Sequence, residues 1–303
     1  MSTQGGSGLD AVMDERHQLI SLAYRLLGSV ADAEDVVQET YARWYALSDA
    51  QQREIETPGA WLSKVASRIC LDLLGSARAR RERYVGDWIP EPVPGGTDWV
   101  NGRSSDPMVD PADRVTLDES LSMAFLVVLE TMTPAERVAF ILHDVFRYSF
   151  AEVAEVVGRT PAACRQLASS ARRHIDAEVS STPTGRRAGL VREFKEAWAA
   201  KDIEALIGLL DPDATTIADG GGLASAVEGR VEGGERLARL YVDLLDKAPD
   251  LTFLERTVNG QPGLVAEQDG VTVTVLAFDF AGDRIKYIWA VRNPEKLRPW
   301  TTE

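Results

Sequence analysis

The sequence predicts a multidomain protein with two all-α domains, the second containing a helix-turn-helix, followed by an α+β domain. Helical periodicity covers most of the first 85 residues and resumes after residue 113. The segment between these regions is rich in Pro, Gly, Asp and Ser, which is typical of a linker. Strand-like alternation appears only near the C-terminus. We therefore expect domains at 1–85, 114–179 and 186–303, with the linker at 86–113.

The composition indicates a folded protein without a membrane segment. Hydrophobic residues make up 45% of the 303 residues, but no apolar run approaches the roughly 18 residues of a membrane helix. The N-terminus lacks the basic and apolar regions of a secretory signal. Cys70 and Cys164 lie far apart, as expected of reduced cysteines in the cytoplasm. His17, His143 and His174 have no metal-ligand spacing with them, so we expect neither a metal nor a cofactor.

Positive charge is concentrated in two short segments, although the formal net charge is −14. Residues 158–175 contain four arginines and no acid, and residues 78–83 contain four arginines and one glutamate. The segment 87–119, which lies between them, holds eight acids and two arginines. Because phosphate contacts require Lys and Arg, the two basic segments are candidate DNA contacts separated by an acidic connector.

Three amphipathic helices are expected in the first domain. The first ends at Gly28, and the third opens at Thr57-Pro58, a cap residue followed by a first-turn proline. The residues expected to face the core are, helix by helix, Leu19, Ile20, Ala23, Leu26 and Leu27; Ala33, Val36, Val37, Thr40 and Trp44; and Trp61, Leu62, Val65, Ala66, Ile69 and Leu73.

Cap and turn signals between about Thr133 and Ile175 predict a helix-turn-helix. Thr133 opens a capping box with Glu136, and Ser149 caps a second, short helix. Gly158 suits a left-handed turn that ends this helix, and Thr160-Pro161 starts the next. This spacing is that of a helix-turn-helix, in which the second helix enters the major groove.

The last of these helices is expected to present a DNA-binding face. Cys164, Ala168, Ala171 and Ile175 recur at helical spacing and should face the core. Arg165 and Gln166 are placed to read base edges, because Arg binds guanine and Gln binds adenine through two contacts each. The remaining candidate DNA contacts of this region are Arg159, Thr160, Ser169, Arg172 and Arg173. An ordinary helical hairpin with solvated arginines is the alternative.

These residues resemble motifs of the extracytoplasmic-function sigma factors. Residues 32–41 (DAEDVVQETY) resemble that family's polymerase-binding helix, and residues 58–72 its −10-reading helix. The helix-turn-helix is similar to its −35-reading domain. The resemblance implies that core RNA polymerase and promoter DNA are the partners, and that the linker extends toward the polymerase active site. The implied polymerase contacts are Asp35, Gln38, Glu39 and Arg43, and the implied −10 contacts are Ser67, Arg68, Asp72, Arg78, Arg80 and Arg81.

Three further motifs resemble the SigJ-like group, whose members carry a SnoaL-like C-terminal extension. They are WIPEP at 88–92, DGGG at 219–222 and NPEKL at 293–297. Ile89, Leu223 and Ser170 stand where the family usually has Leu, Lys and Arg, respectively. The resemblance implies that these motifs are regulatory, and the residues assigned to this role are Trp88, Pro90, Glu91, Pro92, Asp219, Gly220, Gly221, Gly222, Asn293, Pro294, Lys296 and Leu297.

The C-terminal domain is expected to form the cone of SnoaL-like and NTF2-like proteins. Three helices should precede an antiparallel meander, and a pocket for an unknown small molecule is expected. The aromatic residues expected to line it are Phe194, Trp198, Tyr241, Phe278 and Trp289. The domain has no His or Cys, so catalysis would depend on Asp219 or Asp279, and we expect a regulatory domain and no enzyme.

The function expected is therefore that of a sigma factor that recognises −10 and −35 elements and is regulated in cis by its C-terminal domain. The alternative is a ligand-responsive helix-turn-helix regulator that does not join polymerase. The helix at 32–44 distinguishes the two, because a simple repressor does not need it.

Overall fold

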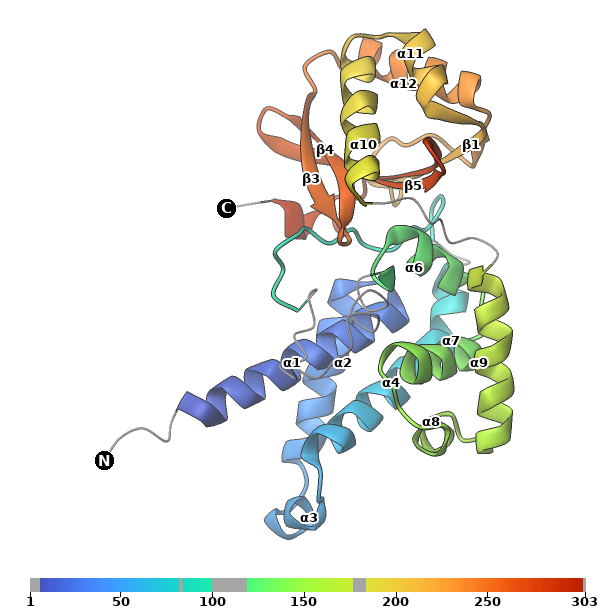
Figure 1. Cartoon of the computed structure of the whole chain (residues 1–303). Helices are drawn as coiled ribbons and strands as arrows, with labels where there is room; N and C mark the ends of the chain where they lie inside the picture. Colours follow the sequence, from blue (N-terminus) through green and yellow to red (C-terminus); the bar gives the residue numbers. More distant parts are fainter. Residues whose placement is uncertain (1–5, 82–83, 100–118, 177–183, 302–303) are drawn as a thin grey trace. The chain divides into compact units, whose positions relative to one another are not determined.

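The computed structural model describes residues 6–81, 84–99, 119–176 and 184–301. These residues form two compact units. The first unit contains the N-terminal helices and most of the helix-turn-helix region. The second contains the C-terminal α+β domain together with two upstream segments, from the linker and from residues 121–127. The two all-α regions followed by an α+β domain confirm the predicted fold class (Figure 1).

Four helices build the N-terminal part of the first unit. They are α1 (Gly6–Leu27), α2 (Val30–Tyr45), α3 (Asp49–Glu54) and α4 (Pro58–Arg81). The predicted stripe of α1 is buried, and so are the inward residues of α2 except Trp44. Trp44 is partly exposed and lies edge-on to Trp61, with 5.3 Å between the ring centres. Helix α4 begins at Pro58, as the Thr57-Pro58 pair predicts.

The helix-turn-helix region follows in α6 (Met123–Glu130), α7 (Pro134–Phe140), α8 (Phe150–Val157) and α9 (Pro161–Asp176). The predicted capping box at Thr133 is present, and Ser149, the predicted cap of α8, forms a second capping box with Glu152. Gly158 adopts the left-handed conformation with φ of 69° and ends α8. After α7 the helix widens into a π-helix at Ile141–Val145, whose first, second and last residues are buried.

The C-terminal domain packs three helices on a six-stranded sheet. The helices are α10 (Thr184–Ala199), α11 (Ile203–Leu209) and α12 (Gly234–Lys247). The strands are β1 (Leu210–Asp219), β2 (Val231–Glu232), β3 (Thr252–Val258), β4 (Gln261–Gln268), β5 (Val271–Ala281) and β6 (Arg284–Val291), in the order β2-β1-β6-β5-β4-β3. A short 3-10 helix at Arg298–Trp300 follows.

The meander predicted for the sheet holds for β3 to β6, but two strands were missed. Strand β1 pairs with β6 in parallel and with β2 antiparallel. The first half of β1 contains Asp211, Pro212 and Asp213, and its register shifts between Leu210 and Thr215. This polar, irregular segment has no clear alternation, so the sequence pattern does not reveal a strand.

The two faces of the sheet contact different partners. One face packs under α10, α11 and α12 (Figure 1) and includes Ile288. The opposite face packs against Ile89 of the linker and Met123 of α6. Trp289 belongs to this second face, so the expectation that it lines the pocket under the helices was wrong: successive strand residues point to opposite faces, and its neighbour Ile288 already points to the helices.

None of the helices within the described residues combines the length and apolar character that a bilayer span requires.

Candidate nucleic-acid interface and linker-binding site

Helix α9 has the two faces that the sequence predicts. Cys164, Ala168 and Ala171 are fully buried, whereas Ile175, expected to be buried with them, is partly exposed. The exposed side chains on the other face are Arg165, Gln166, Ser169 and Arg173, and Arg159 and Thr160 are exposed just before the helix. This face therefore offers cationic and amide donors.

Several of these side chains have partners within the same unit. The guanidinium of Arg165 lies 5.1 Å from the ring centre of Phe150 in α8. Arg172 donates from Nε to Asp144 Oδ1 at 2.7 Å and is only partly exposed. The Thr160 hydroxyl accepts a hydrogen bond from the Ala163 N–H at 3.2 Å and so caps α9. Arg172 is thus a candidate phosphate contact whose positive charge is already paired with the Asp144 carboxylate.

The candidate −10 residues of α4 contact the helix-turn-helix. Arg68 is exposed, but its Nη2 donates to the Glu155 carbonyl oxygen at 2.7 Å, and Lys64 pairs with the Glu155 carboxylate. Ser67, an implied −10 contact, is fully buried and so not available to DNA in this structure, and its hydroxyl donates to the Ser63 carbonyl oxygen at 2.7 Å. Asp72 is exposed. One guanidinium donor of Arg68 is therefore already bound within the unit.

The remaining candidates of the first unit lie on α2 and at the end of α4. Asp35, Gln38, Glu39 and Arg43 are all exposed on one face of α2, where Arg43 Nε and Glu39 Oε1 form an ion pair at 2.9 Å. The backbone of Arg78, Arg80 and Arg81 belongs to the last turns of α4, and their side chains lie outside the described part of the chain.

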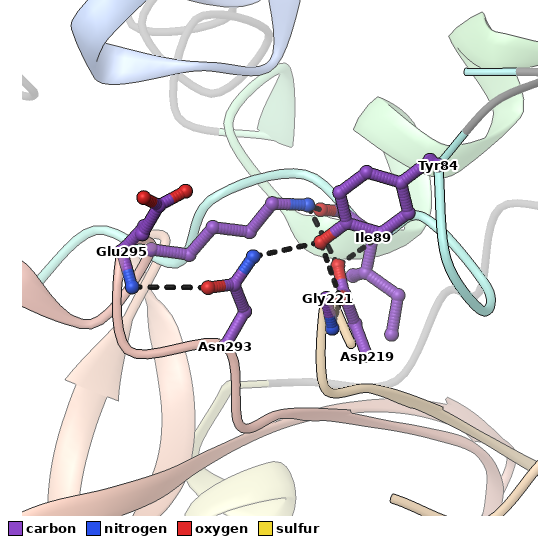
Figure 2. Close-up of polar contacts among 7 residues, drawn as sticks. Tyr84, Ile89, Asp219, Gly221, Asn293 and Glu295 are labelled. Atoms are coloured by element: carbon purple, nitrogen blue, oxygen red, sulfur yellow. Dashed lines mark hydrogen bonds and ion pairs between the residues drawn. The ribbon is translucent and has the colours of Figure 1, made fainter. Parts of the chain in front are cut away.

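In the second unit, Asp219 holds the linker to the C-terminal domain (Figure 2). Its side chain is completely buried at the end of β1 and accepts four hydrogen bonds. Tyr84 Oη and the Gly221 N–H donate to Oδ1 at 2.7 and 3.0 Å. The Ile89 N–H and Lys296 Nζ donate to Oδ2 at 3.0 and 2.6 Å. A carboxylate with this many donors is stabilised in a site that excludes water.

Lys296 and Asn293 complete this arrangement from the other side. Lys296 is 6% exposed, also donates to the Ile89 carbonyl oxygen, and lies 5.0 and 4.3 Å from the ring centres of Tyr84 and Trp88. Asn293 Nδ2 donates to Tyr84 Oη at 2.8 Å. Burial and the bond to Asp219 raise the pKa of Tyr84, so it remains a neutral donor. We call Asp219, Asn293 and Lys296, with their linker partners Tyr84 and Ile89, the linker clamp.

A second set of bonds continues the attachment along the linker. The Val93 N–H donates to Asn259 Oδ1 at 3.0 Å, and the Asn259 N–H donates back to the Val93 carbonyl oxygen at 2.9 Å. Trp300 Nε1 donates to the Pro92 carbonyl oxygen at 2.8 Å, and the Gly95 N–H donates to the Thr257 carbonyl oxygen at 2.9 Å. The buried residues of this stretch are Ile89, Pro90, Glu91, Pro92 and Val93.

The structure brings the motifs at 88–92, 219–222 and 293–297, to which the resemblance assigns a regulatory role, into one site. Trp88 is partly buried beside Lys296, and Leu297 is buried against the linker-facing side of the sheet. Pro294 is exposed and Leu223 is 62% exposed. Sequence reasoning missed Tyr84, Asn259 and Trp300, for which the sequence offers no signal because they act through hydrogen bonds to distant segments.

The glycine motif is explained by the close approach of the linker. Gly221 has φ of +60°, and a Cβ there would lie 2.3 Å from Asn293 Nδ2 and 2.9 Å from Tyr84 Oη. Gly222 also has a positive φ, and a Cβ there would touch Val85. At Gly220 a Cβ would lie 2.1 Å from the Ala224 carbonyl oxygen.

Replacing Gly221 with alanine should therefore loosen the clamp. We expect the free energy of unfolding to fall by about 2 kcal/mol or more, because a left-handed L residue costs about 1–2 kcal/mol before any clash. Gly270→Ala is the matched control, because Gly270 has φ of +77° but open space around it. Denaturant titration of the two variants measures the difference, and equal losses would show that the approach of Asn293 and Tyr84 adds nothing.

Two known family models match the two helical regions of the chain. The Sigma-70 region 2 model matches residues 11–80, and the Sigma-70, region 4 model matches residues 122–175. The ECF RNA polymerase sigma factor SigJ of Mycobacterium tuberculosis is 39% identical over 295 residues, which cover 93% of this chain and 90% of SigJ. The probable ECF RNA polymerase sigma factor SigI of the same species is 34% identical and covers 95% of this chain and 94% of SigI.

A solved structure extends this similarity to the fold. The crystal structure of Mycobacterium tuberculosis SigJ matches with a TM-score of 0.75 and 34% sequence identity, and the match covers 96% of this chain and 98% of that one.

Proposed function

Because the chain belongs to the extracytoplasmic-function RNA polymerase sigma factors, we propose that its C-terminal domain controls promoter use in cis through the linker clamp. Its general role is that of the family: it directs RNA polymerase to promoters. The observation that supports cis control is the burial of Asp219 and Lys296 against Tyr84 and Ile89 of the linker. The clamp and a polymerase channel would compete for the same linker residues.

In this proposal α2 meets the polymerase and two surfaces meet the promoter. The polymerase contact is made by the exposed face of α2, with the side chains of Asp35, Gln38, Glu39 and Arg43. Arg68 and the end of α4 contact the −10 element. The exposed face of α9 contacts the −35 element. Such a protein acts where RNA polymerase is found, in the cytoplasm.

The C-terminal domain serves as a regulator and not as an enzyme in this proposal. Both oxygens of Asp219, one of the two acids on which catalysis would depend, are occupied by donors from the linker and from Lys296. A general base needs an accessible lone pair beside its substrate. The alternative of a regulator that does not join polymerase leaves the match to Sigma-70 region 2 without a role.

Run-off transcription with core polymerase tests the proposal. We expect full-length protein and a truncation after Pro183 to differ several-fold in transcript yield, because the truncation removes every clamp partner of the linker. The full-length Asp35→Lys variant is the control: it keeps the clamp but should lose core binding and transcription. Equal yields from full-length and truncated protein at equal core occupancy would contradict cis control.

A further inference from the structure

The C-terminal domain contains an apolar cavity that the sigma-factor role does not use. It has a volume of about 290 Å³ and lies between α12 and the face of the sheet that the helices cover. Its walls are mostly aliphatic and include Leu240, Leu244 and Leu276, and Trp198 and Tyr241 also line it. Small-molecule sites in proteins have this combination of concave shape and apolar walls.

The charged side chains that line the cavity are cations. Lys247 and Arg292 are the charged residues among those that line it, and no Asp, Glu or His of the described residues does so. Tyr241 and Thr216 hydrogen-bond to each other at 3.0 Å, and Thr216 donates to the Ile288 carbonyl oxygen. Burial raises the pKa of Tyr241, so this pair stays neutral. In a chain with a net charge of −14, a cavity with two cations and no acid selects for an anion.

Arg292 is the residue that fits an anionic group best. Its Nη1 donates to the Ser225 carbonyl oxygen, but its Nε is buried without a hydrogen-bond partner among the described residues. Burial lowers the pKa of this guanidinium, which means that its surroundings do not compensate its charge. Buried donors in proteins almost always have an acceptor, and a planar carboxylate suits a guanidinium. Lys247 is exposed at the end of α12 and forms no ion pair within the described residues.

We propose that this cavity binds a small amphiphilic carboxylate, whose apolar body packs between the sheet and α12 and whose carboxylate binds Arg292 and Lys247.

The same backbone segments form the cavity and the linker clamp. The N–H groups of Arg292 and Asn293 donate to the Asp219 carbonyl oxygen at 2.7 and 2.9 Å. Ser225, which Arg292 holds, follows directly on the glycine turn that begins after Asp219. A ligand that needs Arg292 and this turn in place binds the clamped state better and so increases its population. This coupling, unlike the binding itself, rests on the proposed cis regulation.

Calorimetric titration of the full chain with sodium octanoate and with 1-octanol tests the binding site. The two probes have equal chain length and differ in charge. We expect octanoate to bind to the wild-type protein. Arg292→Gln should weaken the affinity for octanoate at least tenfold, and Lys247→Gln at least threefold. Neither substitution should change the affinity for octanol. Arg236→Gln is the matched control, because Arg236 is an exposed arginine of α12 that does not line the cavity. Ala248→Phe fills the cavity and should weaken both probes.

Three results would overturn the site: no octanoate binding, equal octanoate affinity of wild type, Arg292→Gln and Lys247→Gln, or unchanged binding in Ala248→Phe. Chymotrypsin cleavage after Trp88, which the clamp partly buries, reports on the coupling. Octanoate should slow this cleavage several-fold in wild type and leave it unchanged in Arg292→Gln. Binding without slower cleavage would overturn the coupling. Neither measurement uses polymerase, so both outcomes are separate from failure of the sigma-factor proposal.

Discussion

Replacing Lys296 with methionine is expected to free the linker from the C-terminal domain. Among the described residues, Lys296 is the only cation that donates to Asp219, and it also donates to the Ile89 carbonyl oxygen. Methionine keeps much of the side-chain volume but leaves the Asp219 carboxylate buried without a counter-charge. Breaking a buried ion pair by removing one partner costs about 3–5 kcal/mol. The free energy of unfolding should fall by an amount of this size, and chymotrypsin should cleave after Trp88 much faster.

A second lysine of the same domain provides the control. Lys286 lies in β6 and pairs with Asp211 of β1 at 2.9 Å. Lys296, which follows β6 in the chain, likewise pairs with a carboxylate of β1, that of Asp219. Its side chain is 27% exposed, compared with 7% for Lys296. Partly solvated pairs contribute about 1 kcal/mol or less, so Lys286→Met should have a small effect on stability and none on cleavage after Trp88. Equal losses in the two variants would mean that the clamp is no stronger than a surface ion pair.

The same variant has a consequence for transcription. If the linker must leave the clamp to enter polymerase, its release removes part of the free-energy cost of forming holoenzyme. A difference of 1.4 kcal/mol corresponds to about tenfold in the released population. We therefore expect Lys296→Met to give several-fold more run-off transcript than wild type at subsaturating concentrations of sigma factor. A lower or unchanged yield, with core binding intact, would show that the clamped linker is the form that polymerase uses.

Local signals in the sequence predict the helical part of this fold well. The capping boxes at Thr133 and Ser149 and the glycine at 158 act through hydrogen bonds and backbone angles within a few residues. Such interactions can be identified from spacing alone, and the division of α9 into a buried and an exposed face follows from the same helical period.

The parts that sequence reasoning missed depend on contacts between distant segments. The polar start of β1 becomes a strand because it pairs with β2 and β6. Ser67 is buried because α4 packs against several helices, although the resemblance implied a −10 contact for it. The resemblance of the motif at 219–222 implied a regulatory role for Asp219, but its partner Tyr84 lies 135 residues away. Such a pairing is created by the tertiary fold and has no counterpart in local spacing.

Substitutions of two arginines of α9 are expected to have large but different effects on promoter binding. Arg165 is exposed near the N-terminus of the helix beside Gln166, and Arg173 is exposed near its C-terminus. In a helix-turn-helix the N-terminal residues of the second helix contact base edges, and flanking cations contact phosphates. Arg165→Ala should therefore weaken holoenzyme binding to the upstream element by about 1–3 kcal/mol and reduce discrimination at a single base pair.

Arg173→Ala should instead weaken binding to all sequences and reduce the salt dependence of the binding constant by about one phosphate contact. Titration of holoenzyme with promoter variants at several salt concentrations distinguishes the two patterns. Arg172 is less suitable for this comparison, because its ion pair with Asp144 would be lost at the same time. Equal losses on every sequence for Arg165→Ala would assign Arg165 to the phosphate backbone. Neither arginine belongs to the linker clamp, so this result tests the DNA-binding face of α9 independently of cis regulation.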